Sequence, residues 1–267
     1  MKTDRLHLII SALSLMLLAE PAFAWGLYTH TWFAQLTLAA VPLSHPAFRR
    51  AAAAFPRLVM AGASLPDLAL LAGWMKTPSF RASHDWDLAR QMLASPQPAD
   101  QAIALGYASH LLVDVIAHHH FVPDHEQRWF NWPTLTHALC EWAMDRHIAD
   151  RLQAPPAELL LSQSSQLAPF VAHHFHCPQP LAEQAIRRLA HADQGLRRGR
   201  LPSIIYRSTR RIDKRLVQRF DDYLHATAQH LTDLNRLIDG HFPLHHPNGV
   251  ATTAADQPAL IPASLFA

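Results

Sequence analysis

Imidazole and carboxylate side chains recur along the first half of the chain at spacings that suit a metal ion. His110 and Asp114 are four residues apart in an apolar stretch, residues 103–122, that predicts a helix, so both side chains project from one face. His137 and Glu141 repeat this spacing on a second predicted helix. Imidazole and carboxylate with little thiolate suit zinc and other first-row cations. The two pairs therefore predict a metal centre built on two helices.

Further candidate ligands lie before and between these pairs. Asp67 follows a Leu-Pro dipeptide, and His84 lies in a Ser-His-Asp-Trp segment. Three consecutive histidines, His118, His119 and His120, follow the first pair. Helical periodicity puts His118 on the same face as that pair. A single histidine is weak evidence for a metal, but an ordered set of histidines and carboxylates favours one.

The start of the chain predicts a secretory signal that would itself create a ligand. Residues 1–24 combine a basic start, a short apolar run and an Ala-Phe-Ala exit, which is typical of a cleaved signal peptide. The apolar run is too short to span a membrane. Cleavage after Ala24 would make Trp25 the first residue, whose free amine and carbonyl oxygen form a chelate that His30 could complete. We expect export to the periplasm or the outside of the cell.

Composition predicts the elements that must position these residues. Removal of the signal leaves 243 of the 267 residues, with few glycines and much alanine and leucine. This composition favours an all-α fold: a single multi-helix domain over residues 25–240, followed by a poorly ordered tail over 241–267. The main expected helices span residues 31–40, 45–55, 84–93, 99–122, 133–152, 156–174, 180–191 and 203–238.

Positive charge is concentrated late in the chain. Residues 187–219 contain eleven Lys and Arg against two Asp, a local net charge of +9 in a chain whose net charge is +2. Such a segment could hold anionic headgroups or a nucleic-acid backbone, or it could be a solvated helix face. The sequence leaves these alternatives open.

Aromatic residues and cysteines flank the second pair. Trp129, Phe130 and Trp132 precede His137 and are candidates for substrate binding, through entry into a lipid interface or stacking on a base. They could equally close the packing between two helices. Cys140 and Cys177 allow one disulfide in an exported protein, although a buried thiol at Cys140 would also suit the predicted ligand helix.

The order of these residues resembles the zinc-dependent phospholipase C superfamily. This superfamily includes the single-strand-specific nucleases of fungi and plants and the catalytic domain of glycosylphosphatidylinositol-specific phospholipase D. The resemblance runs from Trp25 to Glu141. The opening Trp-Gly-x3-His looks like the nuclease branch, and the closing His-x3-Glu looks like the phospholipase branch. The resemblance implies three zinc ions in a mostly helical domain.

The resemblance also implies how the ligands are shared. Asp67, His84, His110 and Asp114 would hold one zinc; Trp25, His30 and a bridging Asp114 would hold its neighbour; one of the three consecutive histidines would hold the third with His137 and Glu141. Spacing in the bacterial phospholipases favours His120 for that position, whereas periodicity favours His118. We retain both and prefer His120. Asp67 would also orient or deprotonate the attacking water.

The chemistry that such a site supports is phosphodiester hydrolysis. Two adjacent divalent ions neutralise the anionic substrate and lower the pKa of a bridging water, and a third stabilises the leaving oxygen. We therefore expect a secreted trinuclear-zinc phospholipase C-type enzyme that attacks phospholipids at a membrane surface through a metal-bound hydroxide. The alternatives are a single-strand nuclease or 3′-nucleotidase, with nucleic acid as substrate, and a non-enzymatic zinc-binding protein. No protein partner is inferred.

Overall fold

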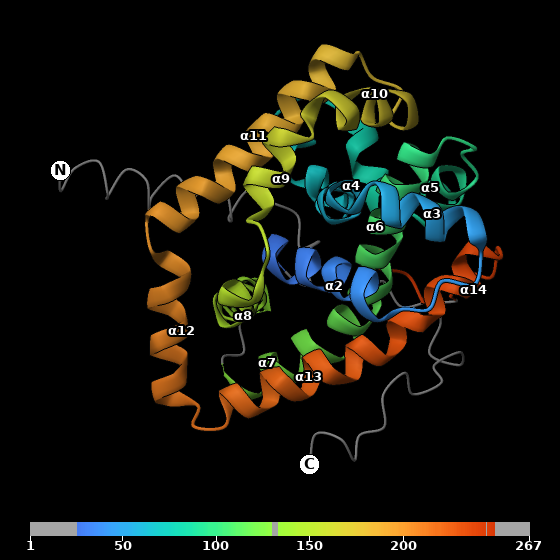
Figure 1. Cartoon of the computed structure of the whole chain (residues 1–267). Coiled ribbons are helices and arrows are strands. Elements are labelled where there is room, and N and C mark those ends of the chain that lie inside the picture. Colours follow the sequence, from blue (N-terminus) through green and yellow to red (C-terminus); the bar gives the residue numbers. More distant parts are fainter. Residues whose placement is uncertain (1–25, 130–132, 244, 249–267) are drawn as a thin grey trace.

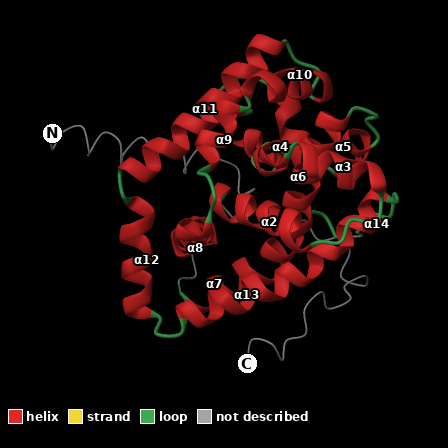
Figure 2. Cartoon of the chain, in the orientation of Figure 1, coloured by secondary structure: helices red, strands yellow, loops and turns green. Residues whose placement is uncertain are grey.

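The described part of the protein is entirely helical. The computed structural model describes residues 26–129, 133–243 and 245–248, which form helices joined by loops and contain no strand (Figures 1 and 2). The prediction of an all-α fold is confirmed. Among these residues, no helix is both long and apolar enough to cross a membrane. The predicted signal peptide, Trp25, Phe130 and Trp132 lie outside the described residues.

Prolines begin many of the helices. Proline lacks an amide hydrogen and has a fixed φ, so it is tolerated in the first turn, where that amide would have no partner within the helix. The described helices are, in chain order, α2 (Leu27–Ala40), α3 (Pro46–Ala54), α4 (Pro56–Gly62), η1 (Pro66–Leu71), η2 (Pro78–His84), α5 (Trp86–Leu93), α6 (Pro98–Ile116), the π-helical turn η3 (Ala117–Phe121), α7 (Val122–Arg128), α8 (Pro133–Ile148), η4 (Ala149–Arg151), α9 (Pro156–Ser162), α10 (Ser164–His174), α11 (Gln179–Arg198), α12 (Leu201–Ile212), α13 (Leu216–His230), η5 (Leu231–Asp233) and α14 (Leu234–Ile238).

Helix α6 forms the centre of the core. Residues 102–116 of this helix are all buried, and α2, α3, α4 and α5 pack around it (Figure 1). Two glycines allow α4 and α6 to approach closely. A Cβ atom on Gly62 would overlap the carbonyl of Ile103, and one on Gly106 would overlap the carbonyl of Val59. This close approach brings the C-terminal end of α4 against the middle of α6.

Helix α2 contacts both helices that carry the predicted ligand pairs. It packs against α6 on one side and α8 on another, and α12 packs on α8 (Figure 1). The start of the predicted tail is described: the Trp86 indole of α5 donates a hydrogen bond to the carbonyl of His245 at 2.9 Å. His245 therefore contacts α5.

The prediction of one helix over residues 203–238 was wrong. Helix α12 ends at Ile212, and α13 begins at Leu216. Asp213 between them has an extended backbone; its carboxylate accepts the amide of Arg215 at 3.0 Å and pairs with Arg219. A short polar side chain that bonds to nearby backbone competes with helical hydrogen bonds, which explains the break. The expected helix over 156–174 is likewise divided, between α9 and α10.

Candidate metal centre

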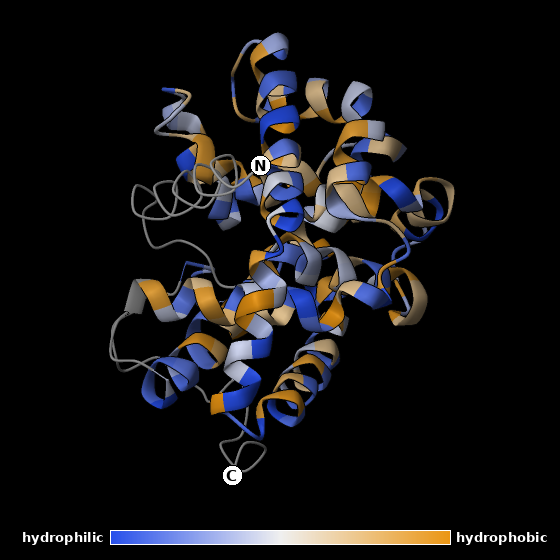
Figure 3. Cartoon of the chain, turned by 90° about the vertical axis from the view of Figure 1, so that its left-hand side faces the viewer, coloured by the Kyte–Doolittle hydropathy of each residue, from blue (hydrophilic) through white to orange (hydrophobic). Residues whose placement is uncertain are grey.

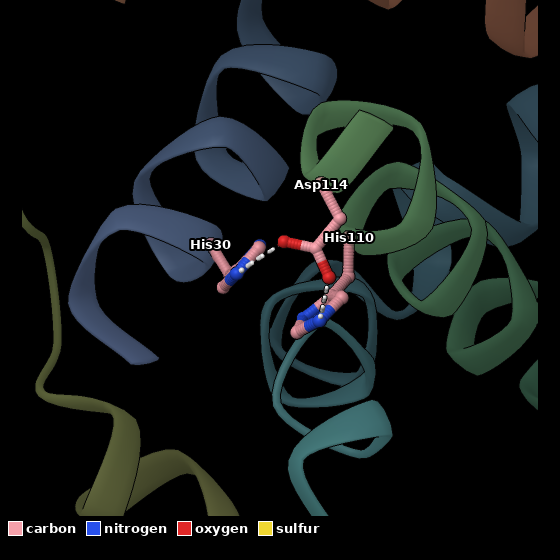
Figure 4. Close-up of side chains that lie close together, drawn as sticks. All are labelled: His30, His110 and Asp114. Atoms are coloured by element: carbon pink, nitrogen blue, oxygen red, sulfur yellow. Dashed lines mark ion pairs between the residues drawn. The ribbon is translucent and has the colours of Figure 1, made fainter. Parts of the chain in front are cut away.

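Asp114 lies at the centre of a group of buried histidines. Its Oδ1 is 3.2 Å from Nε2 of His30 on α2. Its Oδ2 is 2.9 Å from Nε2 of His110, one turn earlier on α6, and 3.3 Å from Nε2 of His84 at the end of η2. Figure 4 shows the carboxylate between the rings of His30 and His110. Asp114 therefore presents one oxygen to each of two groups, as a bridging ligand does.

The outer nitrogens of His84 and His110 are held by acceptors. Nδ1 of His110 lies 2.8 Å from the carbonyl oxygen of Ala63, which can only accept, so we assign the proton to Nδ1. Oγ of Ser83 donates to the carbonyl of Pro66 at 2.6 Å and therefore accepts from Nδ1 of His84 at 3.2 Å. In the neutral rings, both Nε2 atoms would carry lone pairs, and they face each other at 3.3 Å. This is how histidine ligands are oriented around a metal ion.

Asp67 completes the first group. Asp67, His84 and His110 each offer a ligand atom, and the three atoms lie within 4.8 Å of one another; His30, His110 and Asp114 form a second such group. Oδ2 of Asp67 is buried without a hydrogen-bond partner among the described residues. A cation held by the two groups would give this oxygen a partner.

The two buried carboxylates differ in their electrostatics. Burial raises the pKa of Asp67 to about 8, against the influence of His110 and with that of the Asp114 carboxylate. Burial alone would also raise the pKa of Asp114, but His110 and His30 outweigh it and hold that pKa well below its usual value. The ionised form of Asp67 therefore lacks sufficient positive charge nearby, and a bound cation would favour it.

His118, His137 and Glu141 form a further group. Nε2 of His137 lies 2.9 Å from Oε1 of Glu141, and the rings of His118 and His137 are 5.3 Å apart between centroids. In the described structure, both of these atoms and Nε2 of His118 are buried without a hydrogen-bond partner. Burial lowers the pKa of His118 to about 3 and raises the pKa of Glu141. His118 is therefore held as the neutral imidazole that binds metals.

The structure brings His118, and not His120, to His137. The π-helical turn over Ala117–Phe121 follows directly from α6, and Pro123 comes two residues later, where it cannot donate a helical hydrogen bond. His120 is half-buried, and the charged neighbours of its ring are histidines outside this group. The preference for His120 therefore does not match this arrangement, whereas helical periodicity does.

Comparison with known proteins identifies the family. A family model described as zinc dependent phospholipase C matches residues 29–190, which is more than half of the chain. The chain belongs to this family. No curated protein and no solved structure gave a match. All the described candidate ligands lie inside the matched region. The match and the two groups of candidate ligands support a family of zinc-dependent phosphodiester hydrolases.

Sequence reasoning missed Asp145, which anchors the first turn of α2. The carboxylate of Asp145 accepts the amide of Thr29 at 2.9 Å, the Thr29 hydroxyl at 2.8 Å and the amide of Tyr28 at 3.4 Å. Arg197 of α11 pairs with the same carboxylate and stacks on the Tyr28 ring at 3.8 Å. A Cβ atom on Gly26 would overlap Asp145.

This anchor fixes the chain directly after the predicted cleavage site. Because Asp145 binds Tyr28 and Thr29 in the first turn of α2, it also fixes the position of His30, the next residue of the same turn. The signal was present in the sequence: Asp145 continues the four-residue spacing of His137 and Glu141, so the same helical face carries all three.

Of the remaining predicted residues, the structure describes Trp129, Cys140 and Cys177. Trp129 is half-buried, and its indole donates to Oδ2 of Asp213 at 3.3 Å; Phe130 and Trp132 are outside the described residues. Within the described chain, Cys140 and Cys177 are free thiols. The thiol of Cys140 donates to the carbonyl of His137 at 3.0 Å, so it packs within the helix that carries the third group.

Proposed function

We propose that this protein is an exported phospholipase C-type phosphodiesterase that uses three zinc ions. The observation that carries the proposal is the position of Asp114, with one oxygen toward His30 and the other toward His84 and His110. A shared carboxylate is how two metal ions are held close together. Two close ions suit in-line displacement at a phosphodiester.

The donor sets fit zinc, because they combine neutral imidazole with carboxylate and leave buried ligand atoms without protein partners. Zinc would neutralise the phosphodiester and lower the pKa of a coordinated water. The proposed ligands are Asp67, His84, His110 and Asp114 for one ion; His30, Asp114 and the amine and carbonyl of Trp25 for the second; and His118, His137 and Glu141 for the third.

The surrounding residues orient these ligands. The carbonyl of Ala63 and the hydroxyl of Ser83 fix the rings of His110 and His84, which cannot rotate without losing those hydrogen bonds. Oδ2 of Asp67 accepts no hydrogen bond from the described residues. If Asp67 holds zinc through one carboxylate oxygen, its other oxygen could accept a hydrogen bond from the attacking water and take its proton.

The proposal includes processing and export. Removal of residues 1–24 would create the amine of Trp25, and the anchor at Asp145 would hold the following turn in place. The expected substrate is a phospholipid at a membrane surface, met in the periplasm or outside the cell.

The test is a parallel assay of processed, zinc-loaded protein on phosphatidylcholine vesicles and on single-stranded DNA. Release of phosphocholine without DNA cleavage supports the proposal, whereas DNA cleavage alone would assign the protein to the nuclease branch. Asp67→Asn should abolish hydrolysis. The matched control is Asp87→Asn, because Asp87 is exposed and pairs only with Arg90 among the described residues. Zinc binding without hydrolysis of either substrate would support the non-enzymatic alternative.

A further inference from the structure

The outward face of α12 combines exposed isoleucines with arginines. Ile204 is 55% exposed and Ile212, two turns later, is 72% exposed. Arg207 and Arg211 are exposed between them on the same face, since residues three, four and seven apart are neighbours on a helix. Trp74 is the one other large hydrophobic residue that is exposed in the described part of the chain. Two of three such residues thus lie on this face.

The opposite side of α12 is packed against the domain. Pro202, Ile205 and Thr209 are buried. The Tyr206 hydroxyl lies 2.9 Å from Nδ1 of His147 on α8. The isoleucines on the outward face are therefore not needed for the packing of α12. Figure 3 views the molecule from the side on which α11 and α12 lie, and hydrophilic and hydrophobic positions alternate along the ribbon there.

The cations of this face pair with no acidic side chain in the described part of the chain. Arg200, Arg207, Arg211, Lys214 and Arg215 are exposed, and none forms an ion pair with another described residue. Helix α12 itself contains no acidic residue. An exposed row of like charges repels itself and attracts an anionic surface.

We propose that this α12 face, formed by Arg200, Ile204, Arg207, Arg211 and Ile212, docks on an anionic phospholipid membrane. The arginines complement lipid phosphates, and the isoleucines can enter the boundary between headgroups and acyl chains. A nucleic-acid surface would explain the arginines but not the isoleucines, because nucleic acid is held by cations, polar groups and aromatic stacking.

The α12 face is connected to the candidate metal centre through α8. Helix α12 packs on α8, which carries His137 and Glu141. Directly after the C-terminal end of α12, Asp213 accepts a hydrogen bond from the indole of Trp129, one of the residues predicted to bind substrate. Docking on this face would thus hold α8 close to the membrane. That the docked lipid is also the substrate rests on the proposed function, whereas docking itself does not.

The experiment measures binding of the zinc-loaded protein to phosphatidylcholine vesicles, with and without added phosphatidylglycerol, by rapid cosedimentation in the cold. Arg207→Glu/Arg211→Glu should weaken binding to the anionic vesicles by at least about twenty-five-fold, since each cation near the surface contributes about fivefold. Ile204→Ser/Ile212→Ser should weaken it by about tenfold. High salt should weaken binding of the wild type.

The matched control is Arg50→Glu/Arg236→Glu, which makes the same change in net charge at exposed arginines of α3 and α14, away from α12 (Figure 1). This control should retain most of the binding. If it loses as much as the α12 variants, net charge and not the α12 face is responsible, and the proposal is wrong. The proposal is also wrong if both α12 variants bind as the wild type does. Loss of binding to single-stranded DNA on arginine replacement, with vesicle binding unchanged, would assign the face to nucleic acid.

A water-soluble short-chain phosphatidylcholine separates this proposal from the proposed function. The α12 variants should hydrolyse it at the wild-type rate, because docking is not needed for a dissolved substrate. If the wild type binds vesicles through the α12 face but does not hydrolyse this substrate, the proposed function fails and the docking surface stands. If the wild type hydrolyses this substrate but the α12 variants bind vesicles as the wild type does, the docking proposal fails and the proposed function stands.

Discussion

Replacement of Asp145 by alanine should destabilise the protein strongly. Its carboxylate is 1% exposed, accepts two backbone amides and the hydroxyl of the first turn of α2, and pairs with Arg197. Removing one partner of a buried ion pair costs about 3–5 kcal/mol. Arg197 keeps Asp193 at 3.1 Å and is 19% exposed, which favours the lower end of that range. Loss of the helix cap adds about 1 kcal/mol, for a total of roughly 4 kcal/mol.

The assay is urea unfolding at neutral pH with equal zinc loading, supported by thermal unfolding. For a domain of this size the loss corresponds to a decrease in melting temperature of roughly 10 °C. The control is Asp150→Ala near the end of the same helical segment, because Asp150 is 84% exposed and pairs only with Arg146 among the described residues. That change should cost less than about 0.5 kcal/mol. A loss below about 1 kcal/mol for Asp145→Ala would refute the anchor.

Four further predictions concern the metal centre and its surroundings. Asp114→Asn should remove two zinc equivalents in metal analysis; loss of one would contradict a bridging role. EDTA should lower the melting temperature, since a ligand bound only by the folded state stabilises it, and an unchanged value would argue against these sites. Residues added before Trp25 should reduce the zinc content by one equivalent, so a full complement would exclude the N-terminal chelate. Burial raises the pKa of Asp193 from 3.8 to about 6, although Arg197 opposes this. The folded state therefore holds this proton more tightly than the unfolded state does. As the pH rises from about 4 to about 6, the wild type should lose stability relative to Asp193→Asn. Stability curves that stay parallel over this range would contradict the prediction.

The sequence predicted the parts of the site that depend on one helix. A spacing of four residues places two side chains on one face of any α-helix, so the pairs His110–Asp114 and His137–Glu141 could be predicted without a tertiary structure. In both pairs the histidine Nε2 lies 2.9 Å from the carboxylate. The all-α fold was also predictable, because composition and apolar periodicity are properties of the chain itself.

Other features depended on local competition that the pattern did not resolve. Helical periodicity and family spacing pointed to different histidines, and the structure places His118 beside His137. The break at Asp213 was decided by a carboxylate that accepts the amide of Arg215 and also contacts Trp129 and Arg219. That break turns on the balance of a few hydrogen bonds, and residue spacing does not report that balance.

The convergence of the ligands was decided by tertiary packing alone. Asp67 and His84 lie on short 3₁₀ segments with no periodicity to read, and they reach His110 because α4 packs closely on α6 through Gly62 and Gly106. Asp145 meets the start of α2 more than a hundred residues away in the chain. The sequence by itself determined which residues could bind zinc and which share a helical face. Only the packing of helices against one another, driven by burial of their apolar faces, determined which of those residues meet.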